Sequence, residues 1–249
     1  MEVHAHTHTA RKKWTHYFWE FLMLFLAVFC GFLAEYQLEH TIEKQRERQY
    51  MKTLKDDLVA DTLNYNNSLD FWRKLEKNIS NNRALVKPPV VDSNIDKVYR
   101  LAAKLMNADE FLYNDRTIEQ LRNSGNFRLI HNAEVSENLI QYDSYIRNTL
   151  RSQEKVSKDI LLNLMHIQNE IFDSEVLESY LIDENENVGS TIRDKRTIHE
   201  LHDNKIVFKY YNELFLYRVI VLYLINTEVI LKKKAIDLIG LINNNYTLK

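Results

Sequence analysis

The sequence predicts an all-α protein, in which a single N-terminal transmembrane helix precedes a bundle of about four main long helices and some short ones. Three observations lead to this prediction. The 249 residues include only 4 Gly and 2 Pro, and a chain so poor in turn-forming residues has few, long elements. Residues 21–34 form an uncharged apolar run. Beyond that run, apolar residues recur every three or four positions, as on one buried face of a helix.

The chain is expected to comprise three parts: a polar, His-rich tail at residues 1–16, a transmembrane helix at 17–36, and a helical bundle domain at 37–249. In the tail, His4, His6 and His8 alternate, so an extended chain points all three the same way. Imidazoles bind Zn²⁺, Ni²⁺ or Cu²⁺, but binding would require ordering a free terminus, which costs entropy. We expect an unordered tail, with a metal site as the alternative.

The apolar run is short for a membrane span, and its flanks complete it. Alone it covers about 21 Å at about 1.5 Å per residue, against a hydrocarbon core of about 30 Å. Aromatic residues extend it at both ends as interfacial belts: Trp14, Tyr17, Phe18 and Trp19 before it, and Tyr36 after it. The residues that follow, 35–38, do not form the small-residue site of a cleaved signal peptide. We expect a retained span rather than a signal peptide or a buried core helix.

Charge around the span predicts its orientation. Arg11, Lys12 and Lys13 directly precede it, whereas the first basic residue after it is Lys44. The positive-inside rule then places the N-terminus in the cytoplasm and the bundle in the periplasm, for a protein of a bacterial inner membrane. Further basic residues between 44 and 52 weaken this bias.

Two features of the span are candidates for a role within the membrane. Ala27, Gly31 and Ala34 form a face of small residues, which permits close packing of helices in lipid and so predicts a homo-oligomer or a membrane protein partner. Glu20 projects to the same side and is a candidate intramembrane charge. The alternative, which we favour for Glu20, is a carboxylate solvated at the headgroup level.

The bundle elements follow in order. One helix continues from the span to about residue 83 and ends before Pro88, and a second covers about 93–107 from Ser93. A capping box of Thr117 and Gln120 begins a short helix, and Ser124 with Gly125 forms the structural turn that ends it. Asn132 caps a long helix that continues to residue 171. After a polar loop at 183–190 and a helix start at Thr191, a last helix covers about 203–243, in which the apolar residues 219–231 should be buried.

The chain contains no motif that predicts catalysis. Phosphate-binding glycine loops and nucleophile elbows are absent, and the one cysteine, Cys30, permits neither an intrachain disulfide nor a thiolate zinc site. His199 and His202 share a helix face as a weak metal pair, with surface histidines as the favoured alternative. Paired acids such as Asp56 and Asp57 fit solvated faces or caps. We therefore predict no enzyme and no cofactor, and the net charge of −2 disfavours nucleic acid as a partner.

Two stretches carry a family resemblance. RKKWTHYFWEFLMLFLAVFCGFLAEYQLEH at residues 11–40 and TIEQLRNSGNFRLI at residues 117–130 resemble an uncharacterised family of single-pass membrane proteins of Gram-negative bacteria with a His-rich N-terminus. The resemblance implies a membrane anchor in a Gram-negative envelope and no known activity. It also implies that Glu20, Glu35, Ser124 and Gly125 matter.

These observations lead to one favoured function and two alternatives. The favoured function is a membrane-anchored helical interaction or scaffold protein of the bacterial envelope. The first alternative is a module that senses a small ligand near Tyr142, Tyr145, Tyr210 and Tyr211 and signals to a membrane partner, although these tyrosines could equally fill the core. The second is a metal-binding protein that uses His199 and His202 or the His4, His6 and His8 tail.

Overall fold

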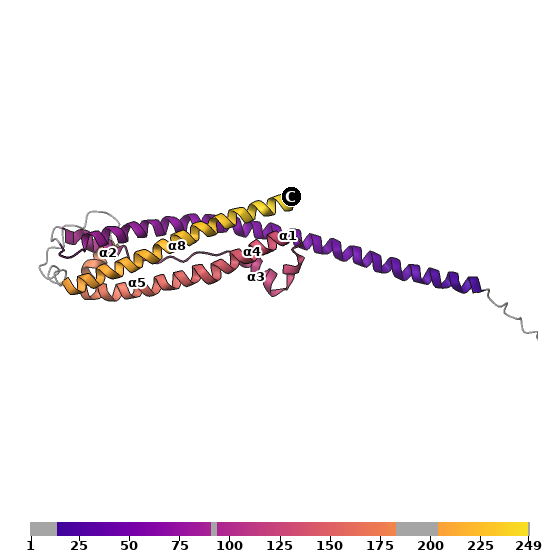
Figure 1. Cartoon of the computed structure of the whole chain (residues 1–249), viewed down its shortest axis with the longest axis horizontal. Coiled ribbons are helices and arrows are strands. Elements are labelled where there is room, and N and C mark those ends of the chain that lie inside the picture. Colours follow the sequence, from indigo (N-terminus) through magenta and orange to yellow (C-terminus); the bar gives the residue numbers. More distant parts are fainter. Residues whose placement is uncertain (1–13, 91–93, 183–203, 249) are drawn as a thin grey trace, which may run out of the picture. The chain divides into compact units, whose positions relative to one another are not determined.

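The computed structural model describes residues 14–90, 94–182 and 204–248, and these residues contain helices and no strand (Figure 1). The all-α class is thereby confirmed. The long α-helices are α1 (Trp14–Leu85), α4 (Ala133–Tyr145), α5 (Arg151–Ile171) and α8 (Asn204–Asn245), and the short ones are α2 (Ile95–Ala103), α3 (Arg116–Asn123) and α6 (Ser174–Ile182). A 3₁₀ segment covers Asn126–Leu129, and a π-helical segment covers Ile146–Leu150.

The chain divides into two compact units, residues 1–49 and 50–249, and α1 contributes to both. In the first unit, nearly every side chain from residue 14 to residue 38 is exposed. Phe21, Phe25 and Phe29 stack along one side of the helix, with successive ring centroids 6.2 and 5.9 Å apart. Residues 14–38 are therefore an apolar helix that no other described residue covers.

The second unit is a bundle around a continuous apolar core. Three long segments lie along one another in this bundle (Figure 1): residues 50–85 of α1, the consecutive helices α4 and α5, and α8. Of these, α5 packs along α8. The stripe predicted from the spacing of apolar residues in α1 is buried at Leu54, Leu58, Tyr65, Leu69, Trp72, Leu75 and Ile79. Amphipathic periodicity thus correctly identifies the buried face of this helix.

Large aromatic side chains fill much of this core. Trp72, Tyr65, Tyr142, Tyr210 and Tyr217 have at most 1% of their surface exposed. Two of the four tyrosines considered for a ligand pocket, Tyr142 and Tyr210, therefore belong to the core. Their hydroxyls find partners there: the Tyr142 hydroxyl lies 3.3 Å from that of Tyr65, and the Tyr210 hydroxyl accepts from Gln168 Nε2 at 3.1 Å.

Local predictions had mixed outcomes. The Asn132 cap is confirmed, because its side chain accepts from the Val135 amide. The capping box at Thr117 is wrong: α3 begins at Arg116, and the Thr117 hydroxyl donates to Asp57 of α1. The expected uninterrupted helix to residue 171 contains the π segment, and α6 was not predicted.

The buried state predicted for residues 219–231 is only half correct. Val221, Leu224 and Leu231 are fully buried. On the opposite side of the same turns, Leu222 and Tyr223 are 41% and 58% exposed. This part of α8 is therefore apolar on both its core face and its outer face.

Several predictions fall outside the described residues: the histidines of the tail, the Ser93 helix start, the loop at 183–190, the Thr191 start, and the His199 and His202 pair.

Candidate functional site

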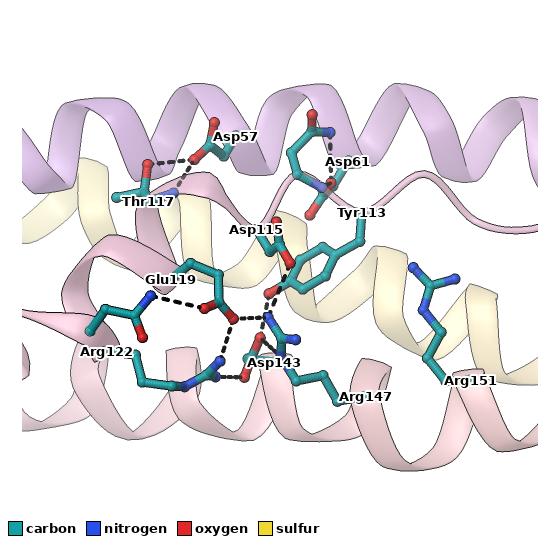
Figure 2. A network of polar contacts seen from close by, with 12 residues as sticks. Asp57, Asp61, Tyr113, Asp115, Thr117, Glu119, Arg122, Asp143, Arg147 and Arg151 are labelled. Atoms are coloured by element: carbon teal, nitrogen blue, oxygen red, sulfur yellow. Dashed lines mark hydrogen bonds and ion pairs between the residues drawn. The ribbon is translucent and has the colours of Figure 1, made fainter.

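The polar contacts of the bundle converge on the connection between α2 and α4, residues 104–132. In Figure 2, acidic side chains of α1 and α4 face donors from this connection and from α4. Because the connection is mostly non-helical before α3, its backbone groups need partners that helices cannot supply. The acids supply those partners.

Asp61 of α1 is the most buried acid in Figure 2. Its Oδ1 accepts from both the backbone amide and the side-chain amide of Asn114, each at 2.9 Å, and its Oδ2 accepts from the Tyr142 hydroxyl at 2.7 Å. Burial raises the pKa of Asp61, the three donors lower it, and the nearby Asp57 raises it. With its oxygens already paired, Asp61 joins α1, the connection and α4.

Asp57 lies one turn earlier on α1 and acts as the cap of α3. Its Oδ2 accepts from the Thr117 amide at 3.1 Å and from the Thr117 hydroxyl, while its Oδ1 accepts from Arg116 Nη2 at 2.8 Å. The first turn of a helix has unpaired N–H groups that favour a carboxylate. Here the capping carboxylate comes from another helix rather than from the residue before α3.

Asp143 of α4 is the centre of an ion-pair network. Its Oδ1 accepts from the Tyr113 hydroxyl and from Arg147 Nε, both at 2.9 Å, and its Oδ2 accepts from Arg122 of α3. The same two arginines each donate to Glu119 Oε1 at 2.6 Å. Each guanidinium thus bridges the carboxylates of Asp143 and Glu119 through separate nitrogens, so α3 has a defined place on α4.

A second group of contacts fixes the beginning of the connection on α5. Glu154, 3% exposed, accepts from the Phe111 amide at 2.8 Å and from Arg151 at 2.8 Å. Arg151 also donates to the Phe111 carbonyl at 3.1 Å and to Glu110 at 3.0 Å. The extended residues before α3 are therefore attached to the bundle by both a carboxylate and a guanidinium.

Chemically, the carboxylates of this network are engaged in attaching the connection to the helices. A general base or nucleophile needs an available atom within reach of a substrate. The oxygens of Asp57, Asp61 and Asp143 already accept three hydrogen bonds per side chain. Within the described ranges, no group of three or more His, Cys, Asp or Glu side chains is arranged to hold a metal ion.

Glu228 of α8 differs from these acids. It is fully buried, and its Oε1 accepts from Ser68 Oγ at 2.8 Å and from Trp72 Nε1 at 3.0 Å. Its Oε2 is buried with no hydrogen-bond partner among the described residues. Burial raises the pKa of Glu228 to about 7, an effect that the two donors oppose and that Glu154 and Asp109 increase. Near neutral pH this carboxyl group is therefore partly protonated, and it lies in the core between α1 and α8.

The surface of the described bundle residues has several hollows, of which two lie between helices as follows. A groove of about 570 Å³ lies between α4 and α8 and is lined by residues including Ile140, Tyr145, Asn148 and Ile230. A smaller one of about 390 Å³ lies between α1 and α2 and is lined by residues including Asn81 and Arg100. Neither is lined by the polar network. Of the four tyrosines considered for ligand sensing, Tyr145 lines the groove between α4 and α8. The ring of Tyr211 packs against the Arg83 guanidinium, whose Cζ lies 4.2 Å from the ring centroid.

The structure places the other sequence-predicted residues as follows. Gly125 has a φ of 66° and directly follows Ser124, the C-cap residue of α3. The predicted left-handed turn is therefore confirmed. Ala27, Gly31 and Ala34 are exposed along α1, and a Cβ at Gly31 would meet no atom within 4 Å. Glu20 pairs with His16 Nε2 at 3.0 Å.

The sequence prediction missed the buried acids, although the pattern held a signal for two of them. Asp61 lies on the same helical stripe as Leu58 and Tyr65, and Glu228 lies on the stripe of Leu224 and Leu231. An acid within an apolar stripe must be paired or protonated. Asp57 was considered as a solvated face or a cap, and it is a buried cap of α3. For Asp143, the partners Arg122 and Tyr113 lie 21 and 30 positions away in the sequence, so only the contact with Arg147 is local.

The comparisons with known proteins identified no relative of this chain. No family model matches the chain, and no curated protein or solved structure that we compared with it matches either. The family resemblance therefore stays a prediction.

Proposed function

We propose that this protein is a membrane-anchored helical interaction or scaffold protein of the bacterial inner membrane, without catalytic activity. The observation that carries the proposal is the first part of α1. Of the two described helices that are long and apolar enough to span a membrane, α1 has none of its apolar window buried, whereas 44% of the window in α8 is buried. An apolar helix that no protein covers requires another apolar environment.

The bundle supports the second half of the proposal. Its buried acids hold the connection in place, and its described residues offer no free catalytic set. A rigid, network-fixed surface suits recognition, because few side chains lose freedom on binding. The orientation that we propose, with the N-terminus cytoplasmic and the bundle periplasmic, rests on the basic residues at 11–13 and the positive-inside rule. The bacterial setting rests on the family resemblance.

Cross-linking in intact cells tests the interaction role. The full chain is cross-linked, extracted in mild detergent and purified, and its size and companions are determined. A discrete oligomer or one reproducible partner is the expected result. Recovery of the chain only as a monomer, at cross-linker levels that capture a known membrane oligomer in the same cells, would overturn the proposal.

The sensor alternative has one observation in its favour: the groove between α4 and α8, which Tyr145 lines. The metal alternative concerns residues outside the described ranges. Metal analysis of the purified full chain tests it, and a stoichiometric metal that is lost on replacing both His199 and His202 with Ala would support it.

A further inference from the structure

The outer face of α8 carries a surface pattern that the bundle itself does not use. Five apolar residues lie on this face at intervals of seven: Phe208, Phe215, Leu222, Val229 and Ile236. Their side chains are 54, 46, 41, 43 and 51% exposed. Single exposed apolar residues are ordinary on a protein surface, but a continuous stripe of them marks an interaction site.

The interval of seven indicates what kind of partner fits. The buried face of α8 also repeats every seven residues, at Val207, Leu214 and Val221. The exposed stripe therefore keeps a constant side along α8, as the seam of a coiled coil requires, and a second helix can lie along it. A second stripe, four residues after the first, alternates with it and contains Asn212, Val219, Asn226 and Lys233. Asn212, Asn226 and Lys233 are exposed, and Val219 is half-buried. Together the two stripes form a heptad seam, with the second stripe at the positions called a and the first at the positions called d.

We infer that the outer face of α8 binds the α8 helix of a second copy of the chain, side by side and parallel, as a two-stranded coiled coil. This inference deepens the proposed interaction role by naming the partner. We call the residues of the two stripes the α8 seam.

The two asparagines favour a second copy in parallel orientation. In a parallel pair, each seam residue faces its own copy, so Asn212 faces Asn212 and Asn226 faces Asn226. A side-chain amide has both donors and acceptors, and two facing amides satisfy each other, an arrangement that selects parallel dimers. In an antiparallel pair the asparagines face apolar seam residues such as Leu222, and burying an amide without a partner costs roughly 1–3 kcal/mol.

Charges beside the seam fit the same arrangement. In a parallel coiled coil, the residue directly before an a position on one helix lies near the residue five positions later on the other helix. This places Lys232 beside Asp237 of the second copy. Lys232 already donates to Asn66 at 2.7 Å, but its ammonium group has three donors, so it can serve both. Lys233, at the end of the seam, can extend its charged group to water.

Single-cysteine cross-linking of the full chain in native membranes tests the inference. In a Cys30→Ser background, Phe215→Cys and Ile236→Cys are made separately and oxidised with a mild catalyst. Both variants should form disulfide-linked dimers in high yield, because each position faces itself in the parallel pair. Leu63→Cys and Leu162→Cys provide matched controls, since these residues are 60% and 56% exposed on α1 and α5.

The outcomes separate this inference from the proposed function. Adding Leu222→Glu and Val229→Glu to the Phe215→Cys variant should lower the dimer yield at least tenfold, while the circular dichroism melt stays cooperative because both sites are exposed. Yields at residues 215 and 236 no higher than those of the controls would overturn the seam. So would dimers that form only when the two variants are mixed, which indicates antiparallel pairing. If another partner is still captured in cells, the seam fails and the interaction role stands.

Discussion

At the residue scale, Glu228 is the side chain whose environment predicts the clearest measurable effect. Its carboxyl group is fully buried with one oxygen unpaired, and its pKa is raised to about 7. A group with a raised pKa in the folded state favours folding only while it is protonated there. As far as Glu228 determines it, the free energy of unfolding is therefore highest below the ordinary pKa of the group, near 4.5, and it falls as the pH rises to about 7.

Replacing Glu228 with Gln removes this titration. The variant should be more stable than the wild type at pH 8, by on the order of 3 kcal/mol, and the difference should shrink as the pH falls to 5. Urea unfolding of the full chain in detergent, followed at several pH values, measures it. Glu137→Gln, the same change on the exposed face of α4, is the control. A difference between Glu228→Gln and wild type that does not vary with pH would contradict the assignment.

Gly125 is the other residue with a specific conformational requirement. Its φ of 66° is unfavourable for any residue with a Cβ, although no atom within 4 Å would obstruct one. Gly125→Ala should therefore lower the free energy of unfolding by about 1 kcal/mol through backbone strain alone.

Gly240 offers the opposite test. It lies within α8, and a Cβ at this position would meet no atom within 4 Å, so Gly240→Ala should raise the free energy of unfolding by about 0.5–1 kcal/mol. Chemical unfolding of both variants gives the two free energies. A free energy of unfolding that does not fall in Gly125→Ala would show that the turn after α3 does not depend on Gly125.

At the element scale, the placement of α3 depends on acids from other helices. Asp143→Ala would leave Arg122, Arg147 and Tyr113 without their shared acceptor. Because both arginines remain partly exposed, we expect a loss of about 2 kcal/mol rather than the larger cost of a fully buried pair. Trypsin should then cut faster at residues 116, 122 and 128.

The matched control is Asp70→Ala, which removes an ion pair to Lys74 whose partners are 64% and 73% exposed. Such surface pairs contribute little, so its cleavage rate should equal that of the wild type. Equal rates for wild type and Asp143→Ala would show that the network does not hold α3.

How much of these elements the sequence predicted depends on the range of the interaction. The helix that ends near residue 83, the last helix at about 203–243, the Asn132 cap and the Gly125 turn follow from signals within a few residues, and these predictions are confirmed. The capping box failed because Thr117 is bound by Asp57, 60 positions away, and that partner is visible only after folding. The π segment and the exposed half of residues 219–231 likewise depend on how α4, α5 and α8 pack.

The small-residue face of α1 is an element with a prediction of its own. If Ala27, Gly31 and Ala34 pack against a second copy in the membrane, the neighbouring Cys30 should form a disulfide between copies on oxidation. Gly31→Ile should lower that yield several-fold, whereas Val28→Ile, on another side of the helix, should not. Quantitative non-reducing gels of oxidised membranes give the yields. Unchanged disulfide formation in Gly31→Ile would refute packing through this face.

At the scale of the whole molecule, the two units suggest different roles: anchoring for the apolar helix, and recognition for the bundle that the polar network stabilises. The first unit supplies an uncovered apolar surface, and the second supplies a defined shape whose polar groups are used to hold it together. Both the small-residue face and the α8 seam would then join copies of the same chain. Two weak contacts within one pair of molecules reinforce each other, because the first raises the effective concentration for the second.

Membrane retention tests the central claim most directly. Phe25→Lys combined with Phe29→Lys places two charges in the apolar run, each at a cost of about 2.5–3.5 kcal/mol at the centre of a span. The control combines Leu63→Lys and Leu162→Lys on the exposed surface of the bundle. After alkaline carbonate extraction, the wild type and the control should stay in the membrane pellet with their N-terminal residues intact by mass spectrometry, and the Phe25/Phe29 variant should be released. A wild-type chain that is released, or that has lost residues 1–36 by cleavage, would contradict the membrane anchor.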